Sequence, residues 1–223
     1  GFLNVETFVG GSMEDVFRFQ AGSELTNATI DGGLGTNLIE GDQGNGTFLI
    51  TGNNEGSFDA LTGDANIITF TNVGSLSGRG GDDTFEFTET GFLTGLIDGG
   101  LDNDVLIGAD DAGEFFQVNN PDAGNLFNTG PAGAGRRTGT ALGGADGFVN
   151  VENLTGQSGD DYFDVDADLS GNIEGGGGIS HHHGIGRVRR QYMSAEIGDS
   201  GVNLLRNLKN IFILCIVTTI LLA

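Results

Sequence analysis

Aspartates follow glycine-rich turns at several places in this sequence, and each stands two residues before a large apolar residue. Asp83 precedes Phe85 in this way, and Asp104 precedes Leu106. A carboxylate at the end of a turn is a hard, charged oxygen that suits cations such as Ca²⁺. The same side chain also caps turns by hydrogen bonding to nearby backbone amides. The first question is therefore whether these turns bind a metal or only hold the chain in shape.

Acidic residues are concentrated in the first 178 residues. That part holds 29 of the 31 acids, four arginines and no lysine, a net charge of −25, whereas residues 179–223 carry +3. Carboxylates at this density repel one another in a compact chain, so we expect this part to attract metal cations and to avoid nucleic acid. It also contains no cysteine, which excludes a disulfide framework. The composition is compatible with an extracellular protein.

A self-comparison of the sequence shows three related units. Three blocks share the pattern Phe-x-Asn-Val, at spacings of 68 and 78 residues: 2–6, 70–74 and 148–152. Each block is followed by a glycine-rich turn and an alternating apolar segment: 10–19, 78–87 and 156–165. We therefore divide the acidic part into three repeat units: 2–69, 70–147 and 148–178.

Alternating strands are the elements that this pattern predicts. Phe163, Val165 and Leu169 are separated by aspartates, so a strand there would bury the apolar side chains and expose the acidic ones. Apolar clusters recur about every nine to twelve residues, which is typical of a sandwich or a solenoid. The units are similar and each has too little apolar surface for a core of its own, which favours the solenoid. We predict an all-β fold, a right-handed parallel β-solenoid (β-roll or β-helix), for residues 1–178.

The turns resemble those of a known family. GGLDNDVLI at 99–107 and GGLGTNLIE at 32–40 follow the pattern GGxGxDxUx, in which U is a large apolar residue, of the RTX (hemolysin-type) calcium-binding repeats. Asp102 stands where that family has its third glycine, and Asn37 stands at the aspartate position. The NVExLxG and SGDD blocks also look like repeat units of large bacterial secreted or surface adhesins. The resemblance covers about residues 1–178.

The resemblance implies that Ca²⁺ lies between the turns of successive coils. Asp83 and Asp104 are 21 residues apart, about one coil, and they are the carboxylates of the best candidate site. The further candidates are the turn carbonyls and carboxylates around this pair and the equivalent positions in other turns: Gly78, Gly81, Gly99, Asp82, Asp102, Asp15, Asn37 and Asp161. Turn capping by the same aspartates is the alternative.

No catalytic constellation was found in the sequence, so we expect no enzyme. The expected function is a non-catalytic, calcium-stabilised repeat segment, a spacer or adhesive stalk, of a bacterial secreted or cell-surface protein. The expected partners are calcium ions and a surface glycan or protein receptor, with no nucleic acid. One alternative is the accessory repeat domain of a secreted hydrolase or lyase, and another is a solenoid without a specific metal.

The end of the chain differs in kind from the repeats. We expect a junction at residues 179–200 and a hydrophobic, helical C-terminal segment at 201–223. The uncharged run Ile211–Ala223 is too short to cross a bilayer of about 30 Å unaided. Three interpretations are open: a short membrane anchor, the start of a longer transmembrane segment, or sequence foreign to the repeat protein. Membrane contact is expected only through this tail.

Overall fold

A computed structural model describes the part of the chain that contains the repeats. The described residues are 5–20, 25, 27–59, 67–110, 113–128, 147–159 and 161–175. The chain divides into two compact units, Gly1–Ser180 and His181–Ala223, and every described residue belongs to the first, which we call the β-sheet domain. The predicted junction and C-terminal segment lie outside the described residues. Among the described residues, no helix long and apolar enough to span a membrane occurs.

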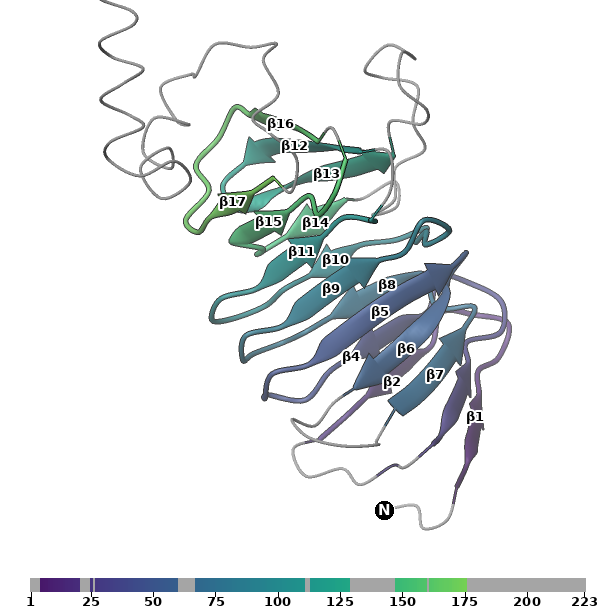
Figure 1. Ribbon diagram of the computed structural model, residues 1–223. Coiled ribbons are helices and arrows are strands. Elements are labelled where there is room, and N and C mark those ends of the chain that lie inside the picture. Colours follow the sequence, from purple (N-terminus) through teal and green to yellow (C-terminus); the bar gives the residue numbers. More distant parts are fainter. Residues whose placement is uncertain are drawn as a thin grey trace, which may run out of the picture. The chain divides into compact units, whose positions relative to one another are not determined.

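The described residues form seventeen strands in two sheets, which Figure 1 shows as successive rungs from β1 at one end to β16 and β17 at the other. The nine-stranded sheet has, in spatial order, β1 (Thr7–Val9), β3 (Thr29–Asp31), β7 (Ile67–Thr71), β6 (Glu55–Asp59), β5 (Thr47–Gly52), β9 (Thr84–Phe87), β11 (Val105–Ile107), β15 (Asn153–Thr155) and β17 (Ile173–Glu174). The eight-stranded sheet has β16 (Tyr162–Val165), β12 (Glu114–Asn120), β13 (Ala123–Asn128), β14 (Phe148–Val149), β10 (Ile97–Asp98), β8 (Ser75–Ser77), β4 (Leu38–Glu40) and β2 (Val16–Arg18).

The predicted right-handed parallel β-solenoid is wrong, because both sheets are mixed and the described residues form no closed solenoid. Most neighbours are parallel, but β6 runs antiparallel to β5 and β7, and β13 runs antiparallel to β12 and β14. Phe48 and Phe58 belong to the apolar clusters that recur about every nine to twelve residues. They are cross-strand partners within the β5–β6 hairpin. Apolar spacing alone does not separate a hairpin from two coils, since both bury every second residue.

The hairpins also explain how the repeat units are arranged. Strands β1, β8 and β15 each follow a Phe-x-Asn-Val block, so successive blocks are seven described strands apart. Because seven is odd, equivalent strands alternate between sheets: β1 and β15 lie in the nine-stranded sheet and β8 in the eight-stranded one. The two hairpins accordingly lie in opposite sheets. Equivalent turns of neighbouring units therefore connect the sheets in opposite directions.

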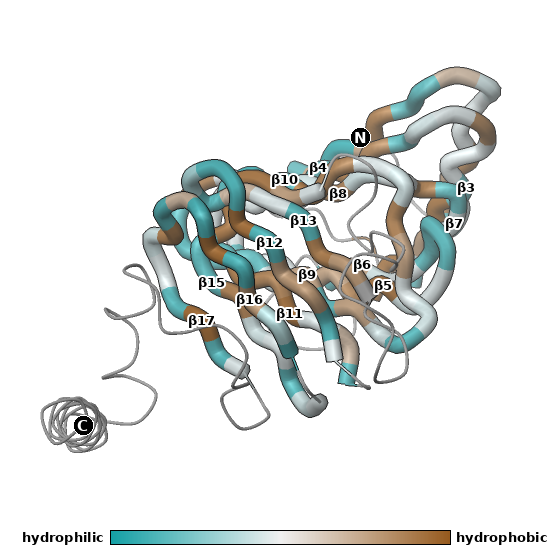
Figure 2. Tube along the Cα trace, turned by 90° about the horizontal axis from the view of Figure 1, so that it is seen from above, coloured by the Kyte–Doolittle hydropathy of each residue, from teal (hydrophilic) through white to brown (hydrophobic). Residues whose placement is uncertain are grey.

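The core lies between the two sheets and is rich in phenylalanine. Hydrophobic and hydrophilic residues alternate along the strands in Figure 2, as expected when one side of each strand is buried. Phe48 stacks on Phe58 and Phe85, with ring centroids 4.2 Å and 4.9 Å apart, and Phe19 meets Phe58 edge to face. Burying one such side chain stabilises the fold by about 1.5–3 kcal/mol. This packing fixes the strands from which the turns emerge.

Candidate functional site

Each aspartate of the predicted turns folds back over the glycine five positions before it. A Cβ atom added at Gly78 would lie 2.0 Å from Oδ2 of Asp83, and one added at Gly99 would lie 2.5 Å from Oδ2 of Asp104. Such approaches are closer than real Cβ atoms make. Glycine is therefore required by the position of the carboxyl group, and the glycine–aspartate spacing of the sequence reflects this packing.

The carboxylates connect neighbouring turns through backbone amides. Oδ1 of Asp83 accepts a hydrogen bond from N of Gly46 at 2.6 Å, and Oδ1 of Asp104 accepts one from N of Asp83 at 2.8 Å. Oε2 of Glu152 then accepts one from N of Asp104 at 2.8 Å. We call Asp83, Asp104 and Glu152 the carboxylate ladder. It links four successive turns, so the carboxyl groups follow one another along the stack.

The exposed sides of the same turns are joined by a second set of contacts. Oδ1 of Asp82 accepts a hydrogen bond from N of Asn103 at 3.0 Å, and Oδ2 of Asp102 accepts one from N of Gly81 at 3.2 Å. Asp102 has a φ of 78°, a left-handed conformation that glycine adopts more readily. The aspartate thus keeps the backbone shape of the glycine that the resemblance expects and adds a contact between turns.

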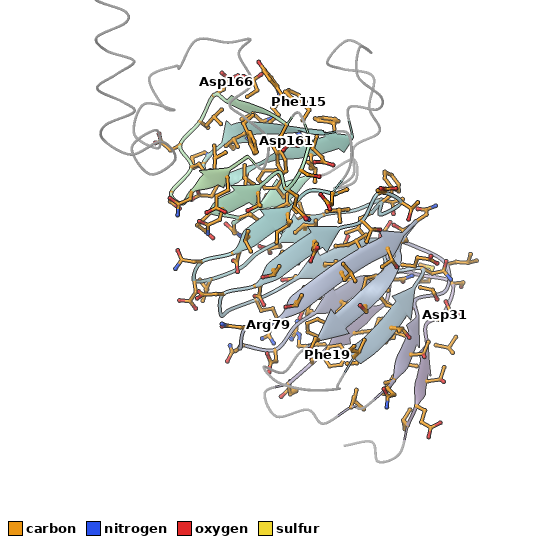
Figure 3. The ribbon with its side chains drawn as sticks, viewed as in Figure 1. Phe19, Asp31, Arg79, Phe115, Asp161 and Asp166 are labelled. Carbon is orange, nitrogen blue, oxygen red and sulfur yellow. The ribbon has the colours of Figure 1, made fainter. Side chains whose placement is uncertain are left out.

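The other predicted site residues lie in two separate groups of turns. Oδ1 of Asn37 accepts a hydrogen bond from N of Asp15 at 2.9 Å, in the turns after β1 and β3. Oδ1 of Asp161 accepts one from N of Glu114 at 3.0 Å, near Phe115 in Figure 3. The structure therefore brings Asp83 and Asp104 together with their turn residues, and it separates them from the remaining candidates.

Two glutamates of these turns were missed from the sequence. Glu114 is fully buried, and its Oε1 accepts a hydrogen bond from N of Ala109 at 3.1 Å. Its Oε2 would lie 2.6 Å from a Cβ atom at Gly108, so it folds over a glycine as the aspartates do. This turn therefore also has an acid folded over its glycine, but six positions after it. Glu152 was missed because it directly follows a Phe-x-Asn-Val block and not a glycine-rich turn.

Asp83 and Asp104 are almost completely removed from solvent. Their side chains are 1% and 0% exposed, and Oδ2 of each has no hydrogen-bond partner. Burial raises the pKa of Asp83 to about 7, although the hydrogen bond from Gly46 opposes this rise, and nearby acids add to it. Burial likewise raises the pKa of Asp104 to about 6, against the hydrogen bond from Asp83. Desolvation thus outweighs hydrogen bonding at both carboxyl groups.

The ladder geometry does not form a shared cage for a cation. Within the described ranges, no group of three or more His, Cys, Asp or Glu side chains is arranged to hold a metal ion. One oxygen of each ladder acid is already bound to an amide of the neighbouring turn. The described contacts therefore give these acids a hydrogen-bonding role between turns.

Comparison with known families gives a match in the last part of the chain. The family model described as FAD linked oxidases, C-terminal domain, matches residues 166–212, about a fifth of the chain. The described part of this segment is 166–175, which contains β17. No solved structure matches the chain.

The match overturns several expectations from the sequence. It points to an oxidoreductase family and to FAD, so the RTX-like recognition and calcium as the cofactor are wrong. The expected adhesin-type calcium-stabilised stalk, the accessory domain of a secreted hydrolase or lyase, and the expectation of no enzyme are overturned by the same match. The turns misled the prediction because a carboxyl group folded over a glycine needs the same residue pattern as a calcium turn.

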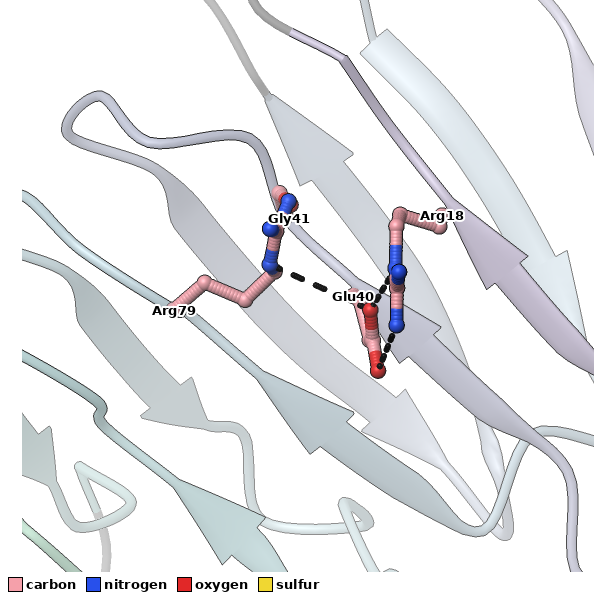
Figure 4. A network of polar contacts seen from close by, with 4 residues as sticks. All are labelled: Arg18, Glu40, Gly41 and Arg79. Atoms are coloured by element: carbon pink, nitrogen blue, oxygen red, sulfur yellow. Dashed lines mark hydrogen bonds and ion pairs between the residues drawn. The ribbon is translucent and has the colours of Figure 1, made fainter.

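The described residues do not fit FAD. Its diphosphate requires cationic groups or free backbone amides, and residues 166–175 contain three acids and no lysine or arginine. The two arginines in the described part of the chain, Arg18 and Arg79, both lie against Glu40 (Figure 4). Arg79 also contacts the carbonyl oxygen of Gly41 at 3.4 Å. The charged side chains of the described residues therefore do not suit a flavin diphosphate.

Proposed function

We propose that this chain is part of an FAD-linked oxidoreductase. The observation that supports this proposal is the similarity of residues 166–212 to the C-terminal domain of FAD-linked oxidases. The similar segment begins within the β-sheet domain, just before β17, and continues past the described residues. In this proposal the β-sheet domain carries the oxidase-like segment and has no step in the flavin chemistry.

The charge of residues 166–212, which we call the oxidase-like segment, also supports a separation of flavin binding from the β-sheet domain. The segment contains five of the nine basic residues of the chain, namely Arg187, Arg189, Arg190, Arg206 and Lys209. Guanidinium groups bind phosphate oxygens in pairs, so this basic segment suits a flavin diphosphate better than the acidic β-sheet domain does. FAD supplies the electron-transfer chemistry when it is bound.

Binding of FAD to the full chain tests the proposal. FAD would be titrated against the purified protein while flavin fluorescence is recorded. A matched pair of variants separates the segment from the rest: Arg189→Gln with Arg190→Gln inside it, and Arg136→Gln with Arg137→Gln outside it. Each pair removes two adjacent arginines and the same charge.

We expect saturable FAD binding that the first pair weakens at least tenfold, since charge-assisted hydrogen bonds contribute about 1.5–3 kcal/mol each. The second pair should leave the affinity unchanged. No binding by the full chain, or an equal loss in both pairs, would contradict the proposal. Circular dichroism of every variant confirms that the β-sheet domain is intact.

A further inference from the structure

Asn37 and Asp104 occupy equivalent positions in two different turns. Oδ1 of Asn37 accepts a hydrogen bond from N of Asp15 at 2.9 Å, and Oδ1 of Asp104 accepts one from N of Asp83 at 2.8 Å. Each donor is the aspartate of the neighbouring turn. The same backbone hydrogen bond is therefore accepted by an amide side chain at Asn37 and by a carboxyl side chain at Asp104.

Their second side-chain atoms also face equivalent groups. A Cβ atom at Gly32 would lie 2.1 Å from O of Asn72 and 2.6 Å from Nδ2 of Asn37. A Cβ atom at Gly99 would lie 1.9 Å from O of Asn150 and 2.5 Å from Oδ2 of Asp104. Asn72 and Asn150 both have a positive φ, 56° and 52°, and both belong to Phe-x-Asn-Val blocks. Oδ2 of Asp104 thus takes the place of an amide nitrogen.

The two positions differ in one hydrogen bond. Nδ2 of Asn37 donates to O of Asn72 at 2.8 Å, whereas Oδ2 of Asp104 has no hydrogen-bond partner. An ionised carboxylate has only acceptors, and a carbonyl oxygen beside it is an acceptor too. Two buried acceptors that face one another are unfavourable, and a proton on the carboxyl group turns one of them into a donor.

The same arrangement recurs at Asp83. A Cβ atom at Gly78 would lie 2.0 Å from Oδ2 of Asp83 and 2.5 Å from O of Gly99, and this Oδ2 also has no hydrogen-bond partner. We propose that the β-sheet domain binds protons at Asp83 and Asp104, whose carboxyl groups donate to the carbonyls of Gly99 and Asn150 and replace the amide seen at Asn37. The proposal does not depend on the proposed flavin function.

The charged surroundings favour the protonated form. The groups that act on Asp83 are Asp104, Asp42 and Asp82, and those that act on Asp104 are Glu152, Asp82 and Asp102. All of them are acids, so none compensates a negative charge on the buried pair. Burial and these neighbours together raise the pKa of both carboxyl groups, to about 7 and about 6.

Exchanging the two side chains tests the proposal in the full chain. Asp104→Asn installs the amide of Asn37, and the reciprocal Asn37→Asp installs a carboxyl group in the other stack. The melting temperature of each variant and of the unchanged protein would be measured at pH 5 and pH 8.

We expect the unchanged protein to melt about 5–10 °C lower at pH 8 than at pH 5. Asp104→Asn should reduce this difference by raising the melting temperature at pH 8, and Asn37→Asp should enlarge it. An Asp104→Asn shift that is equal at both pH values would overturn the proposal, because it would reflect shape alone. A melting temperature of the unchanged protein that is equal at both pH values would also overturn it. If Asn37→Asp does not fold, the comparison of the unchanged protein with Asp104→Asn still tests the proposal.

Discussion

The backbone amide of Asp83 donates to Oδ1 of Asp104 at 2.8 Å, from one turn to the next. This single contact uses the aspartate of one turn as the acceptor for the main chain of its neighbour. In the same way, the amide of Asp104 donates to Oε2 of Glu152, and the amide of Gly46 donates to Oδ1 of Asp83. The acids of the turns therefore stabilise the stack in the way that an asparagine does in the first unit.

The stability of the β-sheet domain should fall as pH rises from about 4 to about 7. The folded pKa values of Asp83 and Asp104, about 7 and about 6, exceed the ordinary value of 3.8. Their contribution is complete below the unfolded pKa and is lost as pH rises through the folded values, on the order of a few kcal/mol. Urea unfolding at pH 4.5 to 8.5 measures it. A free energy of unfolding that increases throughout this range would refute the prediction.

Other carboxylates should produce the opposite trend at low pH. The hydrogen bond from Arg18 lowers the pKa of Glu40, and hydrogen bonds from Asn72 and Gly33 lower that of Asp31. Stability from these groups is present above their unfolded pKa and is lost as pH falls through the folded one. The same urea measurements extended to about pH 2 should therefore show maximum stability at about pH 4, with a loss on the acidic side. Replacing Glu40 by Gln should flatten only the acidic side, and a change on the alkaline side would count against this assignment.

Gly78→Ala should destabilise the fold by about 1–3 kcal/mol or prevent folding, because its Cβ would overlap Oδ2 of Asp83. Gly80→Ala is the matched control in the same turn. A Cβ there would meet its nearest neighbour, in Leu101, at 3.9 Å, so we expect a change within about 0.5 kcal/mol. Thermal unfolding at pH 5 compares the two variants. Equal effects would show that the carboxyl group does not require the glycine.

Phe48→Ala should cost about 3–5 kcal/mol, because the ring is fully buried and stacks between Phe58 and Phe85. The loss should appear equally at pH 5 and pH 8, since no charge is involved. Leu34→Ala removes an apolar side chain that is 69% exposed and should have little effect. Chemical denaturation measures both. A small loss for Phe48→Ala would contradict the stabilising role of this aromatic stack.

Part of the arrangement could be predicted from the sequence. The 21-residue spacing indicated that Asp83 and Asp104 occupy successive turns, and the structure has them in contact. Alternation from Phe163 to Leu169 indicated a half-buried strand; Phe163 is 7% exposed in β16, but that strand ends at the partly buried Val165. Both inferences rested on local periodicity, which a strand–turn repeat determines directly.

The hairpins could not be predicted in the same way. Asn54 and Asp122 reverse the chain with φ values of 57° and 49°. Asn and Asp adopt such left-handed conformations readily but do so at only some positions, so their presence alone does not predict a hairpin. Whether Phe58 pairs within a hairpin or with the next coil depends on contacts from distant residues such as Phe85. The carboxyl chemistry was misjudged for a related reason. Glycine before an acid permits a cation site and a folded-back carboxyl group equally well.

Direct titration of the buried carboxyl groups tests the central structural claim. The full chain, labelled with ¹³C at aspartate carboxyl carbons, would be followed by NMR, with Asp83→Asn and Asp104→Asn used to assign the two signals. We expect midpoints near pH 7 for Asp83 and near pH 6 for Asp104. Midpoints at or below the ordinary value of 3.8 would contradict this claim, because the two carboxyl groups would then be ionised throughout the neutral range.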